Sequence, residues 1–280
     1  MKTRKYFLSF GLVLASVVST YFATISTAQQ GAQTQTVTAD NEYQVGAILY
    51  MQKAAEYRAL AYQAFNIAGM RLDADEKERK KLPKAERRKP RAVVVDVDET
   101  VLDNSPAQAV QVKNRLPFIQ EKWTAWINMR KAKAIPGAID FLNYASRKGA
   151  RIFYVTNRIE VEKQPTIDNL KALGFPDVSD ETVLVKITES SKEARRQTIL
   201  QKYRIALLIG DNLDDLSNVF ERKSIEARFS EVDKLREMFG RRFIVLPNAM
   251  YGTWESAIYE YGRLSEAQKT EKRANALEGY

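Results

Sequence analysis

Two short segments of the sequence place aspartates at spacings that suit phosphate chemistry. Asp96 and Asp98 follow the apolar run from Ala92 to Val95, and Asp211 follows the apolar run from Ile205 to Ile209. Cleavage of a phosphomonoester needs a nucleophile and a proton donor for the leaving oxygen. We expect Asp96 to be the nucleophile that forms an aspartyl-phosphate, and Asp98 to be the general acid and base.

The residue types also define which metal the site can hold. The chain contains no histidine and no cysteine, which excludes histidine and cysteine nucleophiles and the ligands that zinc, copper and iron-sulfur clusters prefer. Carboxylate and carbonyl oxygens suit Mg²⁺. We therefore predict a magnesium site built from the carboxylates of Asp96 and Asp211 and the main-chain carbonyl of Asp98. The metal would draw the phosphate toward an otherwise repulsive carboxylate.

Further polar residues are expected to hold the phosphate. Thr156 and Asn157 follow the apolar run that begins at Arg151, and Lys192 precedes a predicted helix. A hydroxyl, an amide and an ammonium can offset the charge of the phosphate oxygens. We predict phosphate binding by these three side chains, with Asp215 positioning Lys192 or a metal-bound water.

The surrounding pattern indicates an α/β protein with a doubly wound parallel sheet. Short apolar runs alternate with longer segments of helical periodicity. In such a sheet, ligands bind beyond the carboxyl ends of the strands, which is where the polar residues above are found. The predicted strands are 92–95, 151–155, 183–185, 205–209 and 243–246, and the predicted crossover helices are 136–146, 161–173 and 190–203.

The rest of the chain divides into predicted segments around a catalytic domain at 92–265. We expect a long N-terminal helix, capped by Asp40 or Asn41, and a basic linker within residues 40–91. An insertion at about 104–134 is predicted to form a helical cap over the active site. Residues 266–280 are predicted to be a C-terminal tail.

The first residues resemble an export signal. Basic residues precede an apolar run from Tyr6 to about Val18, and Ser26-Thr27-Ala28 is typical of a cleavage site. We interpret residues 1–28 as a signal peptide and 29–39 as a flexible tether, so the protein would be exported to the periplasm or the extracellular space. Cleavage would leave no stable membrane anchor; an uncleaved anchor is the alternative.

The formal net charge of +9 is concentrated in one segment. Between Lys77 and Arg91 there are nine Lys or Arg and two Glu, a local charge of +7. A solvated charge run is the simplest interpretation, and docking to an anionic surface is the alternative. Because the excess of positive charge is concentrated in this linker, we expect no nucleic-acid polymer as a partner.

Together these motifs resemble the class C acid phosphatases and 5'-nucleotidases of the haloacid dehalogenase (HAD) superfamily. The resemblance implies a Rossmann-like HAD fold, Mg²⁺ dependence, and release of phosphate at acidic pH from small phosphomonoesters such as nucleoside monophosphates. It also implies that Trp123 and Tyr251 stack on the base of the substrate, and it makes a homodimer plausible. The matching segments are DVDETVLDNSP at 96–106, IPGAIDFLNY at 135–144, FYVTNR at 153–158, SSKEAR at 190–195, GDNLDD at 210–215 and FIVLPNAMYGTWE at 243–255.

Two other functions fit the same residues. A phosphotransferase would pass the phosphate from Asp96 to an alcohol and not to water. A non-catalytic protein could retain the fold and bind nucleotide or haem, although haem would have to use Tyr or Met because histidine is absent.

Overall fold

The computed structural model describes residues 38–280. The predicted signal peptide at 1–28, and all but the last two residues of the predicted tether at 29–39, lie outside the described residues. Within 38–280, none of the helices has the length and apolar character needed to cross a membrane.

A five-stranded parallel sheet forms the centre of the fold, with the strand order β5-β4-β1-β6-β7. Strand β1 is therefore central, and the chain winds outward from it in both directions. This confirms the predicted doubly wound α/β sheet. The strands are β1 (Arg91–Val95), β4 (Arg151–Ile159), β5 (Val183–Lys186), β6 (Arg204–Gly210) and β7 (Phe243–Val245).

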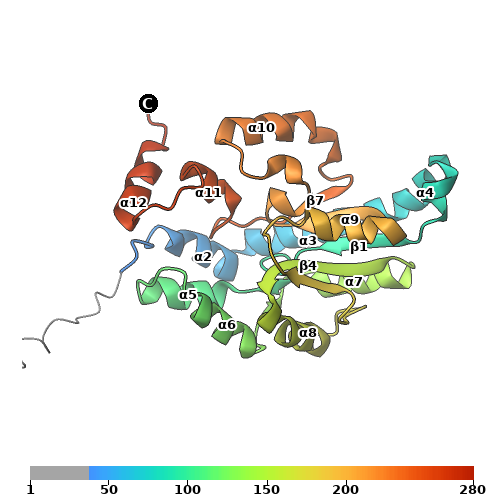
Figure 1. Cartoon of the computed structure of the whole chain (residues 1–280), viewed down its shortest axis with the longest axis horizontal. Coiled ribbons are helices and arrows are strands. Elements are labelled where there is room, and N and C mark those ends of the chain that lie inside the picture. Colours follow the sequence, from blue (N-terminus) through green and yellow to red (C-terminus); the bar gives the residue numbers. More distant parts are fainter. Residues whose placement is uncertain (1–37) are drawn as a thin grey trace, which may run out of the picture. The chain divides into compact units, whose positions relative to one another are not determined.

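Alternation of side chains along β1 builds a core on each face of the sheet. Val93 and Val95 belong to the larger core, with residues of α3, α7 and α8, whereas Ala92 and Val94 belong to the smaller core with Ile199 of α9. Helices α7 and α8 lie on one side of the sheet in Figure 1, and α9 and α10 on the other. The helices are α3 (Ala55–Glu78), α7 (Ala138–Arg147), α8 (Lys163–Ala172), α9 (Glu193–Lys202) and α10 (Ile225–Lys234).

The predicted single N-terminal helix is two helices, so that prediction was wrong. Helix α2 (Gln44–Lys53) is followed by Ala54, whose extended ψ of 128° separates it from α3. The predicted cap was wrong as well, because the N-cap residue is Tyr43 and makes no side-chain cap hydrogen bond. Asn41 is buried, and its side chain donates to the carbonyl of Leu116 in the cap segment at 3.0 Å.

The basic segment is more regular than a linker. Helix α3 continues to Glu78 and is followed by η1 (Arg79–Lys81) and α4 (Lys84–Arg88). Arg91 already belongs to β1, where it is buried and forms ion pairs with Asp75 at 3.7 Å and Glu76 at 3.2 Å. The last residue of the basic segment is therefore part of the folded core and not of a solvated charge run.

The cap segment is helical, as predicted, and closed at its base by a short antiparallel ribbon. Strand β2 (Leu102–Asp103) pairs with β3 (Lys133–Ala134), and helices α5 (Ser105–Lys113) and α6 (Gln120–Asn128) lie between them. Helix α5 packs beside α2 (Figure 1). The cap is therefore supported by the N-terminal part of the chain.

The predicted C-terminal tail contains a docked helix, α12 (Glu266–Asn275), which follows α11 (Thr253–Ile258). Thr270 donates to the Asp40 carboxylate at 2.7 Å, and Arg273 donates to the Asp40 carbonyl at 3.1 Å. These contacts attach the end of the chain to its N-terminal segment. Four short 3-10 helices complete the fold: η2 (Glu160–Glu162), η3 (Leu213–Asp215), η4 (Asn218–Phe220) and η5 (Arg236–Met238).

Candidate active site

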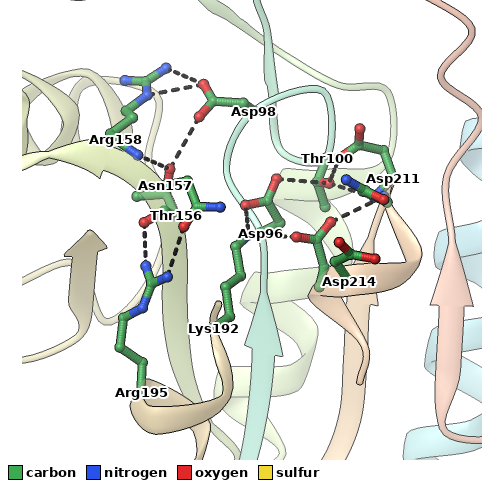
Figure 2. Close-up of polar contacts among 12 residues, drawn as sticks. Asp96, Asp98, Thr100, Thr156, Asn157, Arg158, Lys192, Arg195, Asp211 and Asp214 are labelled. Atoms are coloured by element: carbon green, nitrogen blue, oxygen red, sulfur yellow. Dashed lines mark hydrogen bonds and ion pairs between the residues drawn. The ribbon is translucent and has the colours of Figure 1, made fainter. Parts of the chain in front are cut away.

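The carboxyl ends of the central strands bring the predicted site residues together. Asp96 directly follows β1, Asp211 directly follows β6, and Lys192 is the residue before α9 (Figure 2). Strand β4 runs further than predicted, to Ile159, so Thr156 lies within it. The topology thus explains how residues distant in sequence meet at one sheet edge.

Three carboxylates form the acidic centre of the site. Asp96, Asp211 and Asp215 each offer an oxygen, and these oxygens lie within 4.8 Å of one another. Asp215, predicted only as a supporting residue, takes a place among the carboxylates. The carboxylate of Asp98 is not part of this cluster. Its predicted contact with the metal is therefore through its main-chain carbonyl alone.

Lys192 provides the positive charge inside this cluster. Its ammonium is buried, contacts Asp96, and lies 2.7 Å from Asp215. Burial lowers the pKa of Lys192, but the two carboxylates outweigh this effect and raise it. Burial, together with the charges of the neighbouring carboxylates, raises the pKa of Asp96 well above its usual range and that of Asp211 to about 7. A single ammonium does not balance the charge of three carboxylates, so the site can accept a further cation.

Two residues that sequence reasoning missed orient Asp211. The Thr100 hydroxyl donates to Asp211 Oδ1 at 2.8 Å, and the Asn248 amide donates to Oδ2 at 2.9 Å. Thr100 also lies 3.4 Å from Asp96 Oδ2 (Figure 2). Thr100 lies in the same DVDET segment as Asp96, and this closeness in sequence could have indicated a role in the site. Asn248 comes from a loop that is distant in sequence and offered no such signal.

Gly210 allows Asp215 to reach the cluster. A Cβ atom at this position would lie 2.5 Å from both Cβ and Oδ2 of Asp215, closer than atoms can approach. The glycine of the GDNLDD segment is therefore required by this close approach and not by an unusual backbone angle.

A separate group of donors fixes the side chain of Asp98. Arg158 donates to Oδ1 from Nε at 3.0 Å and from Nη2 at 2.8 Å, and Asn104 donates to the same oxygen at 2.9 Å. The Thr156 hydroxyl donates to Oδ2 at 3.1 Å. Figure 2 shows Asp98, Arg158 and Thr156 on one side of Asp96, with Asp211 on the other. Sequence reasoning did not assign a role to Arg158 or Asn104.

The two predicted phosphate ligands on β4 differ in accessibility. Thr156 is fully buried and its hydroxyl is directed to Asp98, so the structure does not present it as a free phosphate ligand. Asn157 lines the cavity, and its carbonyl oxygen accepts from Arg195 at 2.7 Å, which orients its NH₂ group. Arg195 also donates to the Thr156 carbonyl at 2.6 Å and so braces this end of β4.

A cavity of about 510 Å³ opens over these groups. It is large enough for a small organic ligand. Trp123 of α6 and Tyr251, the predicted stacking residues, both line it, and Phe118 lies 6.3 Å from Trp123 between ring centroids. Lys269 of α12 also lines the cavity, so the segment predicted as a tail contributes to its wall.

A family model and solved structures of acid phosphatases match this chain. The family model described as HAD superfamily, subfamily IIIB (acid phosphatase) matches residues 9–254. The class C acid phosphatase from Bacillus anthracis is 40% identical, with a TM-score of 0.79, and the match covers 85% of this chain and 98% of that chain. A tungstate-bound structure of the class C acid phosphatase from the same organism superposes with a TM-score of 0.80 at the same identity and coverage.

Curated plant proteins match a shorter region. The stem 31 kDa glycoprotein of Glycine max is 29% identical over 129 residues, and acid phosphatase 1 of Solanum lycopersicum is 27% identical over 130 residues. Each alignment covers 44% of this chain and 51% of the relative, so the chain spans about half the length of the curated relatives it matches.

Proposed function

Because this chain belongs to the acid phosphatases of HAD subfamily IIIB, we propose that it hydrolyses small phosphomonoesters with Asp96 as the nucleophile. The observation that supports this most directly is the position of Asp96. It lies at the end of the central strand, borders the cavity, and contacts the ammonium of Lys192. The family membership also confirms the resemblance that the sequence motifs indicated.

The residues present fit a divalent cation. The donor set is three carboxylates with oxygens within 4.8 Å of one another, and one lysine leaves this group with excess negative charge. We propose Mg²⁺, held by Asp96, Asp211 and the carbonyl of Asp98, with Asp215 available as a further oxygen donor. When bound, Mg²⁺ would supply Lewis-acid polarisation of the phosphate oxygens.

The nucleophile follows β1, and the phosphate ligands come from β4 and from the start of α9. Lys192, held between Asp96 and Asp215, would lie beside the phosphate as Asp96 attacks phosphorus. The NH₂ group of Asn157, oriented by Arg195, would bind another phosphate oxygen. Attack forms the Asp96 O–P bond and breaks the bond from phosphorus to the leaving oxygen, giving an aspartyl-phosphate.

We propose that Asp98 moves the proton. Arg158 and Asn104 both donate to its Oδ1, which leaves Oδ2, with Thr156 as its donor, as the oxygen that exchanges a proton. A proton on Oδ2 passes to the leaving alcohol in the first half of the reaction. In the second half, Oδ2 takes a proton from the water that attacks the aspartyl-phosphate.

The lining of the cavity supports nucleoside 5'-monophosphates as substrates. Trp123 and Tyr251 border the same cavity as Asp96, and base stacking on aromatic rings is favourable for any base. We further propose that the protein is exported, because its first residues resemble a signal peptide. A homodimer stays a prediction from the family resemblance, and measurement of molar mass in solution would test it.

One panel of esters tests the proposed function. We expect phosphate release from a nucleoside 5'-monophosphate and from phenyl phosphate in the presence of Mg²⁺, and none from the Asp96→Asn variant, which retains shape but lacks the attacking carboxylate. Chelation should abolish activity and added Mg²⁺ should restore it. Full activity of Asp96→Asn, or of the chelated enzyme, would contradict the mechanism.

A further inference from the structure

Gln108, on the cap helix α5, presents its side-chain amide to the active-site cavity. It is 7% exposed and lines the cavity together with Asp98 and Trp123. Among the residues that the structure describes, none makes a hydrogen bond to its amide. The amide is reached through the cavity, so a polar group of a ligand that enters can take the place of water and contribute binding energy here.

Two other glutamines near this cavity, Gln44 and Gln52, use their amides to bind the protein. The amide of Gln44, which also lines the cavity, donates to the carbonyl of Met250 at 2.9 Å. The amide of Gln52 on α2 donates to the hydroxyl of Ser105 at the start of α5, at 3.1 Å. The amides of Gln44 and Gln52 thus bind other parts of the protein, whereas the amide of Gln108 is available to bind a ligand.

The position of Gln108 indicates which part of a ligand it would meet. Its main-chain N–H donates to the carbonyl of Asn104 at 3.3 Å, and the Asn104 side chain donates to Asp98 at 2.9 Å. Gln108 thus lies one helical turn, a rise of about 5.4 Å, beyond the residue that holds the general acid. Because Asp98 protonates the leaving oxygen, the atoms next to Gln108 belong to the leaving alcohol and not to the phosphate.

We infer that Gln108 determines specificity by binding hydroxyl groups of the leaving alcohol, as in a nucleoside or a sugar. This inference rests on the proposed phosphatase function and adds to it a residue that determines specificity. An amide has a donor and an acceptor, which match a hydroxyl group, itself both donor and acceptor. An aryl or alkyl leaving group would leave the amide unpaired in a dehydrated cavity, and its ester would be a poorer substrate.

The test compares adenosine 5'-monophosphate with its 2',3'-dideoxy analogue, which keeps the base and the phosphate but lacks both hydroxyls. We expect kcat/KM of the wild-type enzyme to favour the hydroxylated ester by about two- to tenfold, the net value of a hydrogen bond between neutral groups. In Gln108→Leu, which keeps the size but removes the amide, the preference should disappear. Gln52→Leu is the matched control, and it should retain the wild-type preference because Gln52 does not line the cavity.

The preference is a ratio within each preparation, so partial unfolding of a variant does not alter it. Equal kcat/KM of the wild-type enzyme for the two nucleotides would overturn the inference even if Gln108→Leu failed to fold. Retention of the preference in Gln108→Leu would overturn it too, and would show that the amide binds water only. Failure of the proposed function would look different, since no ester, including phenyl phosphate, would then be hydrolysed.

Discussion

Arg158 is predicted to act on catalysis only through the orientation of Asp98. Its guanidinium donates twice to Asp98 Oδ1, at 3.0 and 2.8 Å, and its side chain is 2% exposed. In Arg158→Met, Asp98 would keep two neutral donors, Asn104 and Thr156, and lose the two charge-assisted ones. Asp98 would then no longer be held in one orientation for proton transfer.

The expected loss of activity depends on the leaving group. General acid catalysis contributes about 10²- to 10⁴-fold, so we expect kcat for a nucleoside 5'-monophosphate to fall by roughly 10²-fold in Arg158→Met. Phenyl phosphate should lose less than about tenfold, because phenoxide leaves more readily without a proton and depends less on the acid. Arg158→Lys keeps the charge but not the planar fork, and should recover only part of the activity.

Stability gives a second measure of the same contact. Removing one partner of a fully buried ion pair costs about 3–5 kcal/mol. Since the Asp98 side chain is 18% exposed, we expect a smaller loss of about 2–3 kcal/mol, a decrease in Tm on the order of 5–10 °C. Arg130→Met is the matched control, because its ion pair with Asp168 at 2.8 Å is exposed and worth about 0–1 kcal/mol.

Steady-state kinetics with the two esters and thermal unfolding of the three variants make up the assay. A fall in kcat that is equal for the nucleotide and for phenyl phosphate would refute the reasoning, because loss of proton donation must depend on the leaving group. Unchanged kcat for both esters would refute it as well.

Two further predictions concern the aromatic wall and the metal. Trp123→Ala should raise KM for nucleotides by about tenfold or more, since stacking is worth about 1–3 kcal/mol per base, and should change KM for glycerol phosphate little; equal increases would show that Trp123 is structural. Burial and the neighbouring Asp215 raise the pKa of Asp211 from 3.8 to about 7. The protonated carboxyl therefore stabilises the metal-free protein most below the pKa of the unfolded chain, and this stabilisation is lost as pH rises through about 7. Mg²⁺ binds the deprotonated carboxylates and should therefore raise Tm more at pH 7.5 than at pH 5; an equal increase at both values, or no difference between wild type and Asp211→Asn, would contradict this.

The fold could be predicted because its signals are local. Apolar β-branched runs alternate with segments of helical periodicity, and this pattern predicts a parallel sheet with helices on both faces. The same pattern places Asp96, Asp211 and Lys192 at strand ends or helix starts on one edge. The sequence alone therefore determined the fold class, the family and the central acidic residues.

The break in the N-terminal helix could not be predicted in this way. Ala54 favours helix, yet it is extended, and α2 packs on the cap helix α5. The polar residue Asn41 was expected to cap the helix but donates to Leu116, 75 residues away. Packing between distant elements outweighs local preference at both positions.

Tertiary structure alone decided how the side chains of the site pair with one another. Asp98, after β1, bonds to Arg158 of the neighbouring strand β4, and Asp211 is oriented by Thr100 and Asn248. Within residues 38–280, the side-chain amide of Gln108 has no hydrogen-bond partner. Such pairings depend on strand register, side-chain rotamers and the docking of the cap, which residue spacing does not encode. The sequence thus predicted which residues perform the chemistry, and the folded structure decided which neighbours orient them.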